Sequence, residues 1–289
     1  MNFYPTMIQT EQTWTKIIDS KSRLLDLKLR EVIRYRDLVF LLIKRDFAVT
    51  YKQSILGPLW YIIQPLLSAV LYTFIFGNLA DMGTDGVPYL LFYFAGSMLW
   101  TYFSNCLLSS STCFLDNKGV FDKVYFPRLC VPLATTAGHV FKLLIQFACL
   151  LVFYLYYLVV GASIQPTWGI LLSPLLVVWL GGAGMGLGLI ASALTTKYRD
   201  LKFFIQFALP LAMYVTPVVY PLSESPESLR WVFYINPVSV PIEYFRVWFY
   251  GAGNVPMSMM WVSLAELVVV LFAGLLLFSK NERDFVDVI

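Results

Sequence analysis

The sequence predicts an all-α integral membrane protein with six transmembrane helices. Of its 289 residues, 58% are hydrophobic and 13% are charged, whereas about a quarter of the residues in a soluble domain are charged. Six apolar runs are each long enough to cross about 30 Å of hydrocarbon as a helix. They cover residues 58–80, 88–112, 143–160, 169–194, 203–221 and 257–278. We expect the third helix to begin earlier, near Pro132, because Lys142 can extend its ammonium group toward the membrane surface.

The positions of the basic residues predict the orientation of these helices. Of the 21 Lys and Arg residues, 19 lie in the N-terminal region, in the second and fourth connections or after the last run. The other two, Arg230 and Arg246, lie in the fifth connection. Positively charged loops remain in the cytoplasm. We therefore expect both termini to be cytoplasmic, with a cytoplasmic N-terminal region at 1–57 and a six-span transmembrane domain at 58–289.

Residues 22–47 form the first candidate element, a basic amphipathic helix. Charged residues alternate there with apolar ones at helical spacing, among them Leu25, Leu29, Val32 and Leu42. Such a helix fits the cytoplasmic headgroup plane, with its basic side chains near anionic lipid. A helix packed on the cytoplasmic loops of the same chain is the alternative.

The cytoplasmic connection at 114–132 contains a short amphipathic stretch that Pro127 ends. On a helix of two or three turns, Val120, Phe121 and Tyr125 lie on one side and charged residues on the other. An apolar helix face of this kind is suited to a groove on a soluble partner. An ordinary loop is the alternative.

The connection at 222–256 is too aromatic for a plain external loop. Its aromatic residues are interrupted by Asn236, Pro237 and Pro241, and Glu243 and Arg246 form an acidic–basic pair at i, i+3. The pattern predicts two short helices that dip back into the outer leaflet, where irregular backbone is tolerated only if protein or water shields it. The alternative is an aromatic belt that anchors the fold at the membrane interface.

Two features inside the predicted spans suggest special roles. In the fourth span, Gly186-Leu-Gly188-Leu-Ile-Ala191 mimics a dinucleotide-binding fingerprint, and Gly182/Gly186 and Gly184/Gly188 are pairs of small residues. Small residues four apart are typical of closely packed membrane helices, and we expect that role here. Glu266 is the one carboxylate in the middle of a span, where an ionised form is costly. It is a functional candidate, with a structural role as the alternative.

Catalytic chemistry is not visible in the sequence. The four cysteines have no CxxC spacing and the chain has one histidine, so we expect no metal site and a packing role for the cysteines. We also find no nucleophile with a base, no paired carboxylates and no P-loop. A net charge of +3 is too small to indicate a nucleic-acid partner. These observations favour a conduit powered by a separate subunit, with an integral-membrane glycosyl- or acyltransferase as the alternative.

Four stretches of the sequence resemble the type-2 ABC transporter permeases that export polysaccharides and polyol phosphates (Wzm/KpsM/TagG-like). They are YKQSILGPLWYIIQPLL (51–67), KVYFPRLCVPLA (123–134), KYRDLKFF with TPVVYP (197–204 and 216–221) and INPVSVPIEYFR (235–246). The resemblance implies a permease subunit in the cytoplasmic (inner) membrane of a bacterium, which forms a homodimer and binds two ABC ATPase subunits. ATP and Mg²⁺ would be bound by those partners, so no cofactor is expected in this chain. A type-2 permease for drugs or lipids is the alternative.

The resemblance also implies roles for individual segments. Residues 114–128 would contain the coupling helix that is set into the ATPase, residues 22–47 the interface helix, and residues 222–256 the gate helices at the outer mouth. The coupling residues would be Asp116, Asn117, Lys118, Val120, Phe121, Asp122, Lys123 and Tyr125. The interface helix would present Arg30, Arg34, Arg36, Lys44 and Arg45.

The aromatic residues, which make up 17% of the chain, give a physical reason for the lipid-linked glycan substrate that the resemblance implies. Sugar rings stack their C–H faces on aromatic planes, and such contacts tolerate many ring types, as they do for bases in single-strand channels. A long polymer needs weak, repeated contacts of this kind in order to move. The candidate channel aromatics are Tyr93, Trp100, Tyr102, Tyr214, Trp231, Tyr234, Tyr244 and Trp248.

Overall fold

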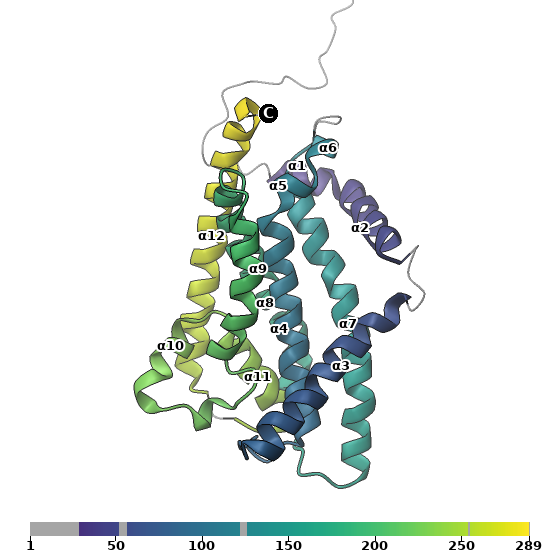
Figure 1. Ribbon diagram of the computed structural model, residues 1–289, viewed down its shortest axis with the longest axis vertical. Coiled ribbons are helices and arrows are strands. Elements are labelled where there is room, and N and C mark those ends of the chain that lie inside the picture. Colours follow the sequence, from purple (N-terminus) through teal and green to yellow (C-terminus); the bar gives the residue numbers. More distant parts are fainter. Residues whose placement is uncertain (1–28, 52–56, 122–125, 254, 289) are drawn as a thin grey trace, which may run out of the picture.

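The computed structural model describes residues 29–51, 57–121, 126–253 and 255–288, and within these ranges the chain is helical with no strands. The long helices run along one axis of the molecule (Figure 1). Helices α1, α2, α5 and α6 and the last turns of α12 gather at one end, here called the basic end. Helices α10 and α11 lie toward the opposite end, here called the aromatic end.

The order of the helices follows the sequence prediction closely. At the basic end the chain forms α1 (Leu29–Arg34), α2 (Arg36–Tyr51), α5 (Cys113–Asp116) and α6 (Lys118–Phe121). The long helices are α3 (Trp60–Tyr72, continued by the π-helix Thr73–Leu79), α4 (Tyr89–Ser111), α7 (Cys130–Val159), α8 (Ser173–Thr195), α9 (Leu201–Ala212) and α12 (Met257–Val288). The aromatic end adds α10 (Arg230–Ile235) and α11 (Ser239–Tyr250). Single 3₁₀ turns cover Gly57–Leu59, Trp168–Leu172, Met213–Val215, Leu222–Glu224 and Glu227–Leu229.

Four of the helical segments in the described residues are long and apolar enough to cross a membrane: Trp60–Leu79, Cys130–Val159, Trp168–Thr195 and Met257–Lys280. The chain is therefore a multi-pass membrane protein. The early start of the third predicted span is confirmed, because α7 begins at Cys130. The fifth predicted span is shorter than expected, and its helix ends at Val215. Pro217 explains this end, because a proline drives the residue before it, here Thr216 (ψ 145°), into extended backbone.

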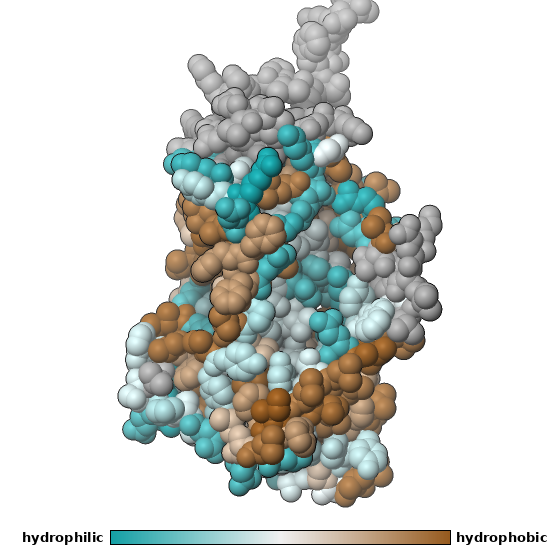
Figure 2. Space-filling view, viewed as in Figure 1, coloured by the Kyte–Doolittle hydropathy of each residue, from teal (hydrophilic) through white to brown (hydrophobic). Residues whose placement is uncertain are grey.

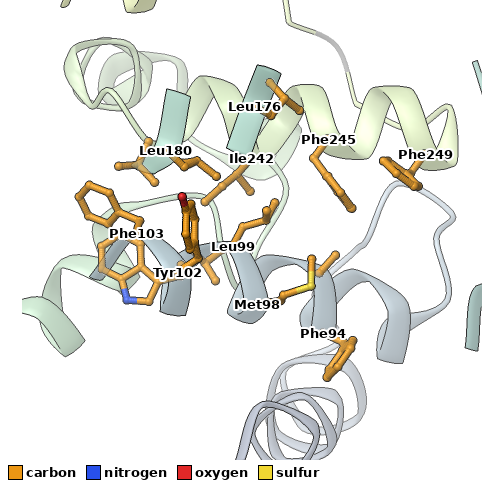
Figure 3. Packing of buried hydrophobic residues seen from close by; sticks show 14 of the residues in the cluster. Phe94, Met98, Leu99, Tyr102, Phe103, Leu176, Leu180, Ile242, Phe245 and Phe249 are labelled. Carbon is orange, nitrogen blue, oxygen red and sulfur yellow. The ribbon is translucent and has the colours of Figure 1, made fainter. Parts of the chain in front are cut away.

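Helix α4 lies at the centre of the described helices and packs against α3, α7 and α8. Fifteen of its 23 residues are buried. A helix with many serines is therefore accommodated at this position, because neighbouring helices rather than lipid cover it. In Figure 3, side chains of α4 such as Met98 and Tyr102 pack against Leu180 of α8 and Phe245 of α11. This core joins the long helices to the aromatic end.

The glycines of α8 act in helix packing, as predicted. A Cβ atom at Gly184 would lie 2.7 Å from the carbonyl oxygen of Phe103 on α4, and one at Gly188 would lie equally close to α4. On the opposite face of α8, the carbonyl oxygen of Gly186 lies 2.5 Å from the Cβ position of Gly274 on α12. The dinucleotide fingerprint is therefore a resemblance in letters only, because these positions are occupied by neighbouring helices.

A second apolar cluster, the basic-end cluster, joins the short helices to the long ones. Val32 of α1, Leu42 of α2 and Cys113 and Phe114 of α5 pack there with Phe278 of α12. The rings of Phe114 and Phe278 are stacked with centroids 4.7 Å apart. Burial raises the pKa of the Cys113 thiol to about 12, so this cysteine has a packing role and is unreactive at neutral pH.

Candidate functional site

The predicted coupling residues lie on two single-turn helices at the basic end, α5 and α6. Asp116 accepts hydrogen bonds from Thr112 Oγ1 (2.6 Å) and from Lys202 Nζ (3.3 Å) at the start of α9. The next residue, Asn117, accepts a hydrogen bond at Oδ1 from Arg45 Nη2 of α2 (3.2 Å). Two adjacent side chains of this segment therefore join α2 to α9.

The apolar side of the coupling segment packs on this chain. The ring of Phe121 contacts those of Phe114 and Phe126, with centroids 6.1 and 5.6 Å away, and the guanidinium of Arg128 lies 5.6 Å from its centroid. Val120 packs against the same cluster. Among the described residues of the segment, the exposed ones are Asp116, Lys118 and Gly119.

The structure divides the expected coupling helix into two parts. Asn117, with φ −113° and ψ 15°, lies between α5 and α6 outside the helical conformation. Asp122, Lys123 and Tyr125 lie outside the described residues.

The basic amphipathic helix is present as α1 and α2. Arg34, Arg36 and Lys44 are exposed, and Arg45 pairs with its neighbour Asp46 at 2.8 Å. Arg30 is part of α1. Val32 and Leu42 are buried in the basic-end cluster, whereas Ile33, Phe40, Leu41 and Val49 are exposed. Residues 22–28 of the predicted helix lie outside the described residues. The remainder packs on its own chain, and its position at a membrane surface stays a prediction, for which these exposed apolar side chains are suited.

The aromatic end contains a buried ion pair, here called the outer clamp. Arg246 and Glu243 are 2% and 1% exposed, and Arg246 Nη1 lies 2.7 Å from Glu243 Oε1. The guanidinium also donates hydrogen bonds to the carbonyl oxygens of Pro217 (2.7 Å) and Val218 (2.8 Å), and it lies 3.7 Å from the centroid of Phe92 on α4. One side chain thus holds α11, α4 and the segment after α9 together.

Two neighbours complete the outer clamp. Glu243 Oε1 also accepts a hydrogen bond from the backbone N–H of Leu222 (3.3 Å). Gly96 of α4 leaves room for the close approach, because a Cβ atom there would lie 2.7 Å from the carbonyl oxygen of Val218. The sequence shows the i, i+3 pair but not its burial, since Glu227 and Arg230 have the same spacing and lie on the surface.

The predicted channel aromatics have different environments in the protomer. Tyr93, Trp100, Tyr102 and Tyr244 are buried in the core, and Tyr234 and Trp248 are half-buried. Tyr214 and Trp231 are exposed, at 48% and 60%. Of the eight predicted residues, this pair therefore has the most accessible rings in the protomer.

Glu266 is half-buried on α12, and its Oε2 atom has no hydrogen-bond partner among the described residues. No group of three or more His, Cys, Asp or Glu side chains that is suited to a metal occurs in the described ranges. Structure and sequence together place polar contacts at both ends of a helical membrane domain rather than at one catalytic centre.

The described residues form a multi-pass helical bundle with short helices at one end and an aromatic helix pair at the other, an architecture that suits a membrane transport subunit. The family model for the ABC-2 type transporter matches residues 37–250. The chain therefore belongs to the ABC-2 type transporter family.

Three relatives share similarity over most of this chain. Two are described as O-antigen export system permease protein RfbA of Klebsiella pneumoniae, with 28% identity over 253 residues and 29% over 268 residues. These alignments cover 88% and 92% of this chain, and 95% and 100% of the relatives. The RfbA permease of Myxococcus xanthus is 27% identical over 263 residues, which cover 90% of this chain and 98% of the relative.

Proposed function

We propose that this chain is the permease subunit of an ATP-driven exporter that moves a lipid-linked polysaccharide of the O-antigen, capsule or teichoic-acid type across a bacterial inner membrane. Membership of the ABC-2 family and the description of the three RfbA relatives as O-antigen export permeases support the proposal. In this arrangement two copies of the chain and two ABC ATPase subunits form the exporter. The ATPase subunits bind ATP and Mg²⁺, and the six predicted spans have both termini in the cytoplasm.

The observation that carries the proposal is the set of contacts around the coupling segment. A separate ATPase needs a surface to push, and that surface must be joined to the membrane helices. Lys118 and Gly119 are exposed, while the adjacent Asp116 and Asn117 are bonded to α9 and α2. A displacement of this segment therefore acts on a long helix and on the interface helix together.

Helix α9 supports the homodimer. None of its residues is buried in the protomer, and its exposed side chains include Phe203, Phe207 and the polar Gln206. A polar amide in a membrane segment is costly toward lipid and favourable toward a partner helix or a wet path. We infer that α9 faces the second copy, with the polymer path between the two copies.

The polymer path would use the exposed aromatics rather than the buried ones. Tyr214 lies at the end of α9, and its carbonyl oxygen accepts a hydrogen bond from the hydroxyl of Tyr220 (2.9 Å), which orders this turn. Trp231 lies on α10 at the same end of the molecule. Flat rings at the mouth would stack on successive sugars without a charge that holds one of them tightly.

A reconstituted complex of this chain with its ATPase tests the proposal. We expect a lipid-linked polysaccharide to stimulate ATP hydrolysis, and we expect polymer to accumulate inside inverted vesicles only with ATP. Stimulation by small drugs or simple lipids without polymer movement would instead favour the drug or lipid permease. Glycosyl or acyl transfer by the purified chain without ATPase would contradict a transport role.

A further inference from the structure

A polar cleft lies between α3, α4 and α7, apart from the coupling segment and the outer clamp. It has a volume of about 210 Å³, which is room for several water molecules. Its polar lining comes from α3 (Tyr61, Gln64 and Ser68), α4 (Thr101, Tyr102 and Asn105) and α7 (His139, Lys142 and Gln146). On the face shown in Figure 2, a recessed hydrophilic area lies where these helices meet, beside the hydrophobic surface of α3.

Lys142 is the charged group of this cleft. Its ammonium lies 4.9 Å from the centroid of the Tyr61 ring, and it is in none of the ion pairs of the described residues. It lies twelve residues after Cys130, where α7 begins, which is about 18 Å along the helix from the basic end. A lysine at such depth is costly unless it lines a wet cavity, and it marks a ligand path by default.

The charge of the cleft is not balanced from within. Among the described residues, no acidic side chain lines it. A smaller pocket shares Tyr61, His139 and Lys142 and includes one carboxylate, Asp46, but that group already pairs with Arg45 at 2.8 Å. The cleft therefore presents an ammonium group with amide and hydroxyl groups, which is the chemistry that binds a phosphate anion.

His139 adds an acceptor at the edge of the cleft. The hydroxyl of Ser109 donates to the carbonyl oxygen of Cys106 (3.3 Å), so its oxygen accepts from His139 Nε2 (3.2 Å). This assignment leaves His139 Nδ1 with the lone pair, and that buried atom has no partner among the described residues.

The surroundings of the cleft identify the kind of molecule that carries the phosphate. Leu67 of α3 and Phe141 and Leu144 of α7 are exposed close to it in sequence. An acyl or prenyl chain can lie against this apolar surface while its phosphate enters the cleft. We propose that the cleft between α3, α4 and α7 binds the phosphate group of a lipid, with Lys142 as its main charge partner. This inference rests on the proposed function, in which the lipid is the carrier of the glycan.

Native mass spectrometry of the purified full chain tests the site, with polyprenyl diphosphate, the matching polyprenol and inorganic pyrophosphate as probes. We expect the wild type to bind polyprenyl diphosphate at least tenfold more tightly than either other probe. Lys142→Gln should weaken that binding at least tenfold, and Lys142→Arg should restore most of it. Lys197→Gln is the matched control, because Lys197 lies 5.2 Å from the ring centroid of Tyr198 outside the cleft, and it should bind as the wild type does.

A second variant, Asn105→Asp, places a carboxylate in the cleft and should also weaken diphosphate binding, so it decides the question if Lys142→Gln does not fold. Unchanged binding in a folded variant of either kind would overturn the site. Equal binding of polyprenol would overturn the role of the phosphate, and equal binding of inorganic pyrophosphate would overturn the role of the lipid. If the wild type binds polyprenyl diphosphate but its complex exports no polymer, the proposed function fails and the site stands.

Discussion

The outer clamp makes a strong prediction about stability. Arg246→Met keeps the length of the side chain but removes its charge and all its hydrogen-bond donors. Glu243 then remains 1% exposed without its charge partner, and the carbonyl oxygens of Pro217 and Val218 lose their donor. Removal of one partner of a buried ion pair costs about 3–5 kcal/mol, and the two carbonyls place the expected value at the upper end.

Thermal unfolding in detergent measures this loss. A thiol-reactive fluorophore reports unfolding, because Cys106, Cys113 and Cys130 are buried in the folded protein. At about 2 °C for each kcal/mol in a chain of this size, we expect Arg246→Met to lower the Tm by about 10 °C. All variants are compared at one scan rate, because unfolding of a membrane protein is commonly irreversible.

The protein contains its own control for this experiment. Arg230 pairs with Glu227 at the same i, i+3 spacing and at 3.5 Å, but the side chains are 37% and 89% exposed. Such a surface pair contributes at most about 1 kcal/mol, so Arg230→Met should leave the Tm nearly unchanged. Equal shifts for Arg230→Met and Arg246→Met would refute the argument that burial makes the outer clamp strong.

Three further predictions concern packing and coupling. Gly274→Val should lower the Tm by about 2–6 °C, since overpacking costs about 1–3 kcal/mol. Gly138→Val should have a smaller effect, because its Cβ position meets open space. Equal effects of the two substitutions would contradict the close α8–α12 packing. Asp116→Asn should leave the Tm unchanged. It should reduce polymer-stimulated ATP hydrolysis several-fold, because it weakens the contact with Lys202. Unchanged stimulation would exclude that contact from coupling. Phe121→Asp should reduce co-purification of the ATPase, because a charge among the rings displaces the segment; normal binding and export would refute the docking assignment.

The sequence predicted the order and positions of the helices because hydropathy and proline act locally. The start of α7 at Cys130 and the two short helices at 230–250 agree with expectation. The end of the fifth helical segment, at Val215 in the 3₁₀ turn after α9, did not agree, although Pro217 was visible, because an apolar run hides the effect of a proline on the residue before it.

The environment of each side chain was much harder to predict. Tyr93 and Tyr214 are both aromatic residues in predicted spans, yet the first is fully buried and the second is 48% exposed. The difference arises from which helices pack on α4 and which leave α9 uncovered. Likewise, Lys142 lies over Tyr61 and lines a cleft, and its position in the sequence does not show this environment. These are tertiary properties that no local pattern contains.

The two ends of α9 are held by contacts of very different strength. At the basic end, Lys202 and Asp116 are 34% and 53% exposed, and such a pair breaks and forms at a cost below about 1 kcal/mol. At the aromatic end, the segment after α9 is held by the buried outer clamp. We therefore expect the weak contact to change during transport and the strong one to move with α9 as a unit.

Paired cysteine substitutions separate these two roles. A disulfide between Asp116→Cys and Lys202→Cys fixes the weak joint, so we expect it to stop ATP-driven export reversibly, with recovery after reduction. A disulfide between Thr216→Cys and Asn236→Cys, whose native side chains are hydrogen-bonded at 2.9 Å, joins parts that already move together and should leave export intact. Loss of export with the second pair but not with the first would show that the gate helices move relative to α9, because only a joint that must open is blocked by a covalent bond.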